Sequence, residues 1–323
     1  MKLTRKLTAL AVTAALSAGS VFAFDVTKLD LPKLKTTMDN GLGDFAAQLA
    51  VAVPQAATQQ NVWADAWIGS LFPGLRFGGG VNFGLTNVNT EGLASAAKAL
   101  GISGIEDTYK FPVITADIRI GGLIIPFDAD IAFIKTGAWD LLGSDLSVEF
   151  TTVGFDFRYA VLEGNLVMPR VSVGAGYFYN QGTFKASSGN GEAIVDYNIH
   201  TFYLQGQISK DFSIPIVRIG FTPFVGGRLF ASKHDNSYEW RYKGKAATAV
   251  DAALAAAGLP SMTSGSGTEK SDMFDFNNMQ PQLYGGIGFN FALLQVTASV
   301  CIDPRTFAED KTWTGALSVR VRH

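Results

Sequence analysis

Residues 74–86 read GLRFGGGVNFGLT, and the character of their side chains alternates at every second position. One face carries Leu75, Phe77, Gly79, Val81, Phe83 and Leu85, and the other carries Arg76, Gly78, Gly80, Asn82, Gly84 and Thr86. Successive side chains of a strand point to opposite faces of its sheet. A period of two therefore predicts a strand that has one apolar face and one polar or glycine-rich face.

The same period recurs along the rest of the chain. It is found in the stretches 113–120, 125–133, 152–159, 170–177, 202–209, 217–229, 281–291, 294–302 and 313–322. Most of these stretches approach the length of about 9–11 residues that a tilted strand needs to cross a membrane. A soluble β-sandwich would instead have strands of about 5–6 residues. We therefore predict an all-β fold with ten membrane-crossing strands.

The connections between these strands alternate in length. Short turns are expected at 121–122, 163–165, 210–213 and 292–293, and long loops at 87–110, 136–146, 182–194, 232–280 and 304–311. Short periplasmic turns, long external loops and an even number of strands are typical of outer-membrane barrels. This rhythm predicts a transmembrane antiparallel up-and-down β-barrel over residues 74–323, located in the cell outer membrane. Eight strands are the alternative if the pair at 281–302 does not form.

The composition agrees with a membrane barrel and excludes several other classes. The chain has 323 residues, 47% of them hydrophobic and 17% charged, with 35 Gly and 24 Phe, a combination frequent in all-β proteins. A net charge of −2 does not indicate a protein that binds nucleic acid. The single cysteine, Cys301, excludes a disulfide scaffold, and no Cys/His cluster indicates a metal or cofactor.

Residues 1–23 have the pattern of a signal peptide. Lys2, Arg5 and Lys6 form a positive start, 7–18 an apolar run, and 21–23 a small-residue cleavage site. The apolar run is shorter than the span of about 20 residues of a membrane helix. We expect export through the inner membrane and a mature chain that begins at residue 24.

Residues 24–73 precede the barrel, and 36–70 contain helical spacing. Met38, Leu42, Phe45, Leu49 and Val53 recur along one helix face. Pro54 is expected to end this helix, and the stretch 63–68 then predicts a second short helix. Two placements remain open for the segment. It is either a plug inside the barrel or a periplasmic segment packed beneath the barrel or on the membrane surface.

The segment 312–323, TWTGALSVRVRH, resembles the terminal strand of bacterial outer-membrane proteins. That resemblance implies recognition of the strand by the barrel-assembly machinery, although the aromatic end of the pattern is replaced by His323. Over 74–323 the chain resembles small outer-membrane barrels, similar in general character to the OmpW and FadL-type families. No motif selects a narrower family.

Charged residues of the polar face gather near the periplasmic ends of the strands. They are Arg76, Arg119, Arg158, Arg170, Arg218, Arg320 and Arg322, with Asp117, Asp128, Asp130 and Asp156. Two interpretations remain open. The charges form either an ion-pair network that fills a narrow lumen or a cationic ring that selects anions.

For function, we expect passive passage of small solutes, including hydrophobic ones, through a monomeric barrel. The alternative is a surface adhesin or structural barrel that acts through the external segment 232–280, in which Lys245–Gly258 has helical character, as has Thr90–Leu100. An enzyme is not expected. Asp128 and Asp130 lie far from His200 in the predicted barrel, and His234 lies at a loop base, so no acid and base are within reach of each other. The expected partners are membrane lipid, the assembly machinery and small solutes or external ligands.

Overall fold

The structure is a computed structural model. It describes residues 26, 29–69, 74–122, 125–136, 139–140, 145–214, 219–272, 279–305, 307 and 312–322. The predicted signal peptide and His323 lie outside the described residues, as does Arg218.

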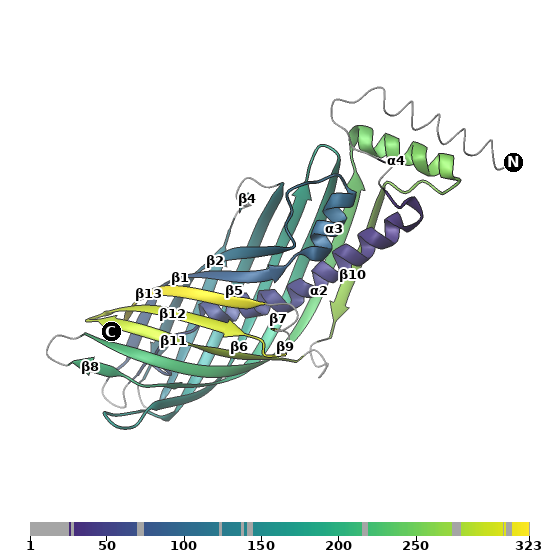
Figure 1. Cartoon of the computed structure of the whole chain (residues 1–323). Helices are drawn as coiled ribbons and strands as arrows, with labels where there is room; N and C mark the ends of the chain where they lie inside the picture. The colour runs from purple at the N-terminus through teal and green to yellow at the C-terminus, as the bar shows by residue number, and fades with distance from the viewer. Residues whose placement is uncertain are drawn as a thin grey trace.

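Ten antiparallel strands form a closed barrel (Figure 1). They are β1 (Arg76–Asn89), β2 (Thr108–Gly121), β3 (Phe127–Lys135), β5 (Leu146–Leu162), β6 (Arg170–Ser187), β7 (Gly191–Ser209), β9 (Ile219–Tyr242), β11 (Gln280–Phe291), β12 (Leu294–Ile302) and β13 (Trp313–Arg322). Each strand pairs with the next in this order, and β13 pairs with β1 to close the sheet. The expected fold is confirmed. Because both β11 and β12 are present, the barrel has ten strands and not the alternative eight.

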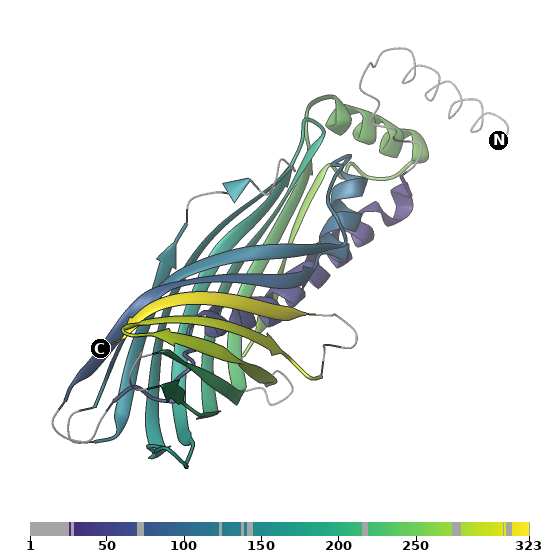
Figure 2. The same cartoon turned by 60° about the vertical axis from the view of Figure 1, so that its left-hand side comes forward.

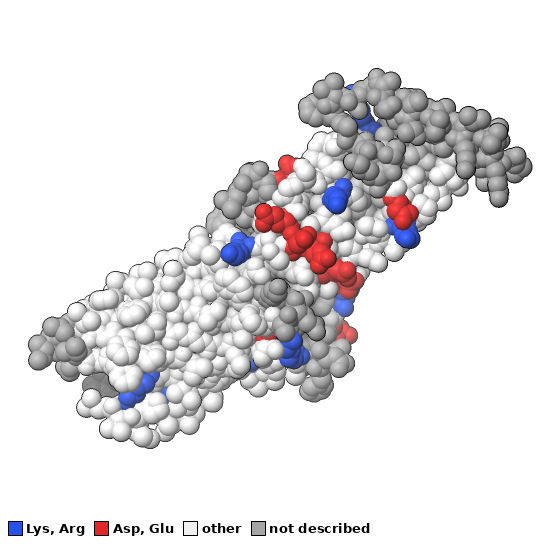
Figure 3. All heavy atoms as spheres, in the orientation of Figure 1, with Lys and Arg blue, Asp and Glu red and all other residues white. Residues whose placement is uncertain are grey.

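The outer face of the barrel is apolar at one end of the molecule. Exposed side chains there include Phe77, Val81, Ile118, Ile131, Phe155, Phe157, Leu204, Phe221, Val225, Phe289, Leu317 and Val319. In Figure 3 this half of the visible surface carries few charges, whereas acidic and basic residues gather beyond it. Closed sheets leave no strand edge unpaired, which makes them suited to cross a lipid bilayer. The apolar band is therefore the membrane-facing surface.

Two external connections are shorter and more ordered than the sequence predicts. The prediction of a loop over 182–194 is wrong for most of these residues. Strand β6 continues to Ser187, and β7 begins at Gly191. Likewise the expected loop 232–280 contains the end of β9, helix α4 (Gly244–Ala257) and strand β10 (Ser264–Ser271), which pairs with β9. Beyond the membrane the pairing continues, but the faces exchange character. Buried apolar residues such as Val195, Ile199 and Trp240 line the inside, and charged residues face outward.

Helix α2 (Leu34–Gln60) runs inside the barrel (Figures 1 and 2). It follows the short helix η2 (Leu31–Lys33) and contacts strands around the wall, among them β1, β6, β7, β9 and β13. Of the two placements that the sequence leaves open, the structure has the helix in the lumen. Its first turn lies at the end with the long connections, beside helix α3 (Glu91–Ala99), and its last turn lies at the neck.

Two expectations about this segment are wrong. Pro54 does not end the helix, which continues for six residues to Gln60. Proline costs a helix about 3 kcal/mol, but alanines at 50, 52, 56 and 57 favour the helix, and the wall encloses it. The stretch 63–68 is not a second helix. Among the described residues, no helix is both long and apolar enough to span a membrane.

Candidate functional site: the lumen plug and an apolar cavity

The neck of the barrel holds a buried ion-pair network. Arg119 Nη1 lies 2.6 Å from Asp128, and its Nη2 lies 3.2 Å from Asp156 and 3.5 Å from Asp130. Arg158 donates to both carboxylate oxygens of Asp128 at 3.0 Å. All five side chains are at most 3% exposed. Charges buried this deeply are tolerated because each is paired and hydrogen-bonded.

We define the lumen plug as residues 34–68, which are α2 and the extended segment that follows it. Arginines of the wall bind the carbonyl oxygens at the C-terminal end of α2. Arg228 Nη1 donates to Thr58 O at 2.7 Å, and Arg320 Nη2 donates to Gln60 O at 3.0 Å. The last four carbonyls of a helix have no partner within it and carry its negative dipole end. The cations therefore stabilise the helix end and hold it at the neck.

The extended part of the plug is held in the same way. Arg320 Nη1 donates to Val62 O at 2.7 Å, Gln207 Nε2 to Trp63 O at 2.8 Å, and Arg158 Nη1 to Asp65 O at 3.1 Å. Most of these bonds reach the backbone of the plug, so the wall supplies partners that an irregular buried segment needs.

Trp63 and Asp65 anchor the plug by their side chains. The Trp63 indole donates to Asp117 at 2.6 Å, and the Arg320 guanidinium lies 4.6 Å from the centre of the ring, a cation–π contact. Asp65 is fully buried and accepts from Arg170 and Arg322, each at 2.7 Å. Sequence reasoning did not select Asp65. The run QAATQQN at 55–61, polar but enclosed by apolar residues, was the available signal for a segment buried in a polar lumen.

The structure brings most of the predicted neck residues together. Arg119, Asp128, Asp130, Asp156 and Arg158 share the buried network. Arg320 pairs with Asp117 at 3.0 Å, and Arg170 and Arg322 bind Asp65. Arg76 is instead exposed at the start of β1. Arg228, which the sequence reasoning left out, joins the network through Gln205 at 3.0 Å. The buried guanidinium groups are engaged by aspartates and by the plug rather than presented to an open passage.

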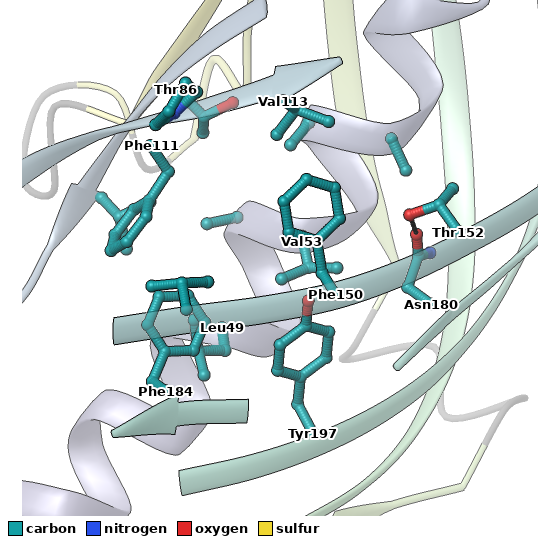
Figure 4. A pocket seen from close by; sticks show the side chains of 16 residues that line it. Leu49, Val53, Thr86, Phe111, Val113, Phe150, Thr152, Asn180, Phe184 and Tyr197 are labelled. Atoms are coloured by element: carbon teal, nitrogen blue, oxygen red, sulfur yellow. Dashed lines mark hydrogen bonds between the residues drawn. The ribbon is translucent and has the colours of Figure 1, made fainter. Parts of the chain in front are cut away.

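An apolar cavity lies between the plug and the wall, on the external side of the neck. Its volume is about 50 Å³. Leu49 and Val53 of α2 face Phe111, Phe150, Phe184 and Tyr197 of the wall (Figure 4). The remaining side chains of the lining are Ala52, Ala56, Ala57, Thr86, Val88, Pro112, Val113, Val148, Thr152 and Asn180. A hydrocarbon lining of this kind favours an apolar occupant.

Among the described residues, the strand pairing of the wall is interrupted beside this cavity. Strand β2 pairs with β3 only from Ala116 onward, and β3 ends at Lys135, opposite Thr151 of β5. Beyond that level, Thr108–Thr115 of β2 pairs with β1 alone among the described strands. Pro112 and Val113, which line the cavity, lie in this part of β2. Beyond β3, the short strand β4 (Trp139–Asp140) pairs with β5. Among the described residues, the cavity therefore adjoins a gap in strand pairing between β2 and the edge formed by β3 and β4.

Within the described residues, no group of three or more His, Cys, Asp or Glu side chains is placed to hold a metal ion. No family model matches the chain, and no curated protein matches it. Its fold is similar to the translocator domain of the autotransporter NalP from Neisseria meningitidis, with 10% identity over 87% of this chain and 99% of that one, at a TM-score of 0.47.

Two further solved structures show weaker similarity. A major outer membrane protein of Thermus thermophilus has 11% identity, covering 78% of this chain and 100% of that one, at a TM-score of 0.32. The attachment invasion locus protein Ail of Yersinia pestis has 8% identity, with coverage of 78% and 100%, at a TM-score of 0.23. The closed barrel with its apolar band places this chain in the cell outer membrane as a β-barrel protein.

Proposed function

We propose that the barrel lets small hydrophobic molecules cross the outer membrane through the apolar cavity. The observation that carries this proposal is the cavity between Leu49 and Val53 of the plug and the aromatic side chains of the wall. Transfer of apolar surface out of water contributes about 25 cal/mol per Å², so such a space favours hydrocarbon over water or ions. The small volume favours slender molecules over bulky ones.

The gap in strand pairing between β2 and the edge formed by β3 and β4 supports a sideways route. A molecule that enters from the external end would leave sideways between Thr108–Thr115 of β2 and the edge formed by β3 and β4. Side chains near this gap, among them Pro112, Val113 and Ile134, are half-buried and apolar. A hydrophobic molecule on this route never has to pass the charged neck.

The filled neck argues against passage of ions along the barrel axis. Arg119, Arg158 and Arg320 are each at most 1% exposed and bind both aspartates and plug carbonyls. An ion would have to displace the segment 61–68 and leave these charges unpaired, which is costly in a low-dielectric interior. The plug therefore stays in place during transport.

The test is uptake of ¹⁴C-labelled n-octane by intact bacteria that carry this barrel in a lipopolysaccharide-covered outer membrane. Val53→Phe puts a larger side chain into the cavity, and we expect it to reduce the initial uptake rate at least fivefold. Val51→Phe is the matched control, because Val51 lies on the same helix and does not line the cavity. Equal uptake by both variants and the parent would overturn the proposal.

A second function, attachment to an external partner, is favoured by one feature. Strands β9 and β10 extend beyond the membrane and carry α4 at their tip (Figure 2). Deletion of residues 244–271 would abolish such attachment and leave octane uptake unchanged. Loss of uptake in that deletion would instead connect the projection to transport.

A further inference from the structure

One polar group in the wall of the apolar cavity lacks a partner. The side chain of Asn180, on β6, lines the cavity and is 1% exposed. Its Oδ1 accepts a hydrogen bond from Thr152 Oγ1 at 2.9 Å (Figure 4). Its Nδ2 has no partner among the described residues. A buried amide N–H without an acceptor is destabilising, so this position needs an explanation.

Thr152 determines which amide atom remains available. Asn180 and Thr152 are paired across β6 and β5, and the threonine hydroxyl donates to the amide oxygen. With its oxygen engaged in this way, the amide offers N–H groups to any molecule in the cavity. Thr152 is thus a positioning residue, and Asn180 is the group that would touch the ligand.

We propose that Asn180 Nδ2 donates a hydrogen bond to an oxygen atom of the transported molecule. This inference rests on the proposed function and narrows its substrate class. The preferred ligand is a slender, neutral, apolar molecule with one acceptor oxygen, such as a ketone, an ester or an alcohol. A carboxylate is disfavoured, because no lysine or arginine is among the residues that line the cavity and an unpaired buried charge is costly.

The position of the donor defines how the ligand lies. Leu49 and Val53 face aromatic rings in one part of the cavity, and Asn180 and Thr152 lie together in another (Figure 4). The oxygen of the ligand would therefore sit beside β5 and β6 while its hydrocarbon part contacts the helix and the rings. A plain hydrocarbon at the same place would leave the amide unpaired.

The test compares binding of 2-octanone and n-octane to the full-length barrel in detergent. Both probes are supplied through the vapour phase at equal thermodynamic activity, so that partition into micelles does not affect the comparison. We expect 2-octanone to bind about tenfold more tightly, the discrimination of one neutral hydrogen bond. A ¹³C label on the carbonyl carbon should report this bond as a downfield shift of its resonance.

Asn180→Leu should remove the preference and the shift while octane affinity stays within twofold. Thr152→Val, which leaves the amide free to rotate, should weaken only ketone binding, and Thr152→Ser should restore it. These variants differ in bulk and polarity. If one of them folds poorly, the others still test whether Asn180 binds the ketone oxygen.

The outcomes separate this inference from the proposed function. If the parent binds octane and octanone equally and Asn180→Leu changes neither affinity, the proposed hydrogen bond from Asn180 is wrong. The proposal that the cavity takes hydrophobic molecules is then unaffected. If neither probe binds the folded parent, the proposed function itself fails.

Discussion

Arg158 and Asp128 face each other across strands β5 and β3 inside the barrel, joined by two hydrogen bonds of 3.0 Å. The same two residues also hold the plug. Arg158 donates to Asp65 O at 3.1 Å, and Asp128 accepts from Ile68 N at 2.7 Å. One wall pair therefore fixes the plug at two points, so the stability of the neck and the position of the plug are coupled.

Removal of one member of this pair should destabilise the barrel strongly. For Arg158→Gln we expect a loss of about 3–5 kcal/mol, because Asp128 would remain buried with less compensation. The measurement is thermal unfolding, followed by the electrophoretic mobility of folded and unfolded barrel. Arg76→Gln is the matched control, since Arg76 is exposed, and it should change stability by less than about 0.5 kcal/mol. Similar losses in both variants would contradict the ion-pair account of the neck.

The intact barrel should be silent in a planar lipid bilayer. The plug and the wall charges fill the neck, so no continuous aqueous path for ions is expected. A variant that lacks residues 34–70 should show discrete conductance steps if it folds. Sustained anion-selective steps from the folded parent protein would show instead that the neck arginines line an open pore.

The start of the plug should be accessible from outside the cell. Asp44 is exposed on α2 near the end with the long connections, whereas Val167 is 84% exposed in the short turn between β5 and β6. A membrane-impermeant maleimide should label Asp44→Cys in intact cells and Val167→Cys only after permeabilisation. The native Cys301 is buried and should give little background. The reverse labelling pattern would invert the orientation of the barrel.

Acid should destabilise the external part of the barrel through Glu192. Burial alone would raise the pKa of Glu192, but hydrogen bonds from Lys243, Lys185 and Arg241 lower it from 4.5 to about 2. A carboxylate with a lowered pKa stabilises the fold above its ordinary pKa, and this contribution is lost as the pH falls from about 4.5 toward 2. Because the three cations are partly exposed, we expect a contribution of about 1–2 kcal/mol.

The measurement for Glu192 is the difference in melting temperature between the parent and Glu192→Gln. The difference should be constant from pH 7 to 5 and shrink as the pH approaches 3. Glu149→Gln, at an exposed position of β5, is the control and should have the melting temperature of the parent at every pH. A difference that does not change with pH would exclude the carboxylate charge as its source.

Much of the barrel could be predicted because membrane strands show their two faces in the sequence. The alternation of Val153, Phe155 and Phe157 with Gly154 and Asp156 is one case: the first set is directed to lipid and the second to the lumen. The alternating long and short connections also predict the orientation, which the labelling experiment tests. Where β6, β7 and β9 leave the membrane, the inner face becomes apolar and the outer face polar. The membrane pattern is therefore reversed there, and the sequence reasoning ended these strands too early.

The plug could not be placed from the sequence because its apolar face fits two environments. Met38, Leu42, Phe45 and Leu49 would pack equally well beneath the barrel or against the inner wall. The contacts that settle its position, such as Arg320 with Gln60 O, are made between backbone and distant side chains, which leave no local pattern. For the same reason Pro54 was misinterpreted, since the enclosing wall compensates the break that proline would cause in an isolated helix.

The central claim is that hydrophobic molecules pass beside the plug while the plug stays in place. A covalent lock between the plug and the wall tests it. A Cβ added at Gly288 of β11 would lie 2.5 Å from Ala64 Cβ, so two cysteines there could form a disulfide once the chain yields by about 1 Å. Ala64→Cys and Gly288→Cys would be combined with Cys301→Ser.

The decisive measurement is octane uptake by cells that carry this locked barrel, before and after reduction. We predict the same initial rate in both states, and the same sensitivity to Val53→Phe. Uptake that is lost in the disulfide form and recovered on reduction would contradict the claim, because it would show that the plug must move to open the path.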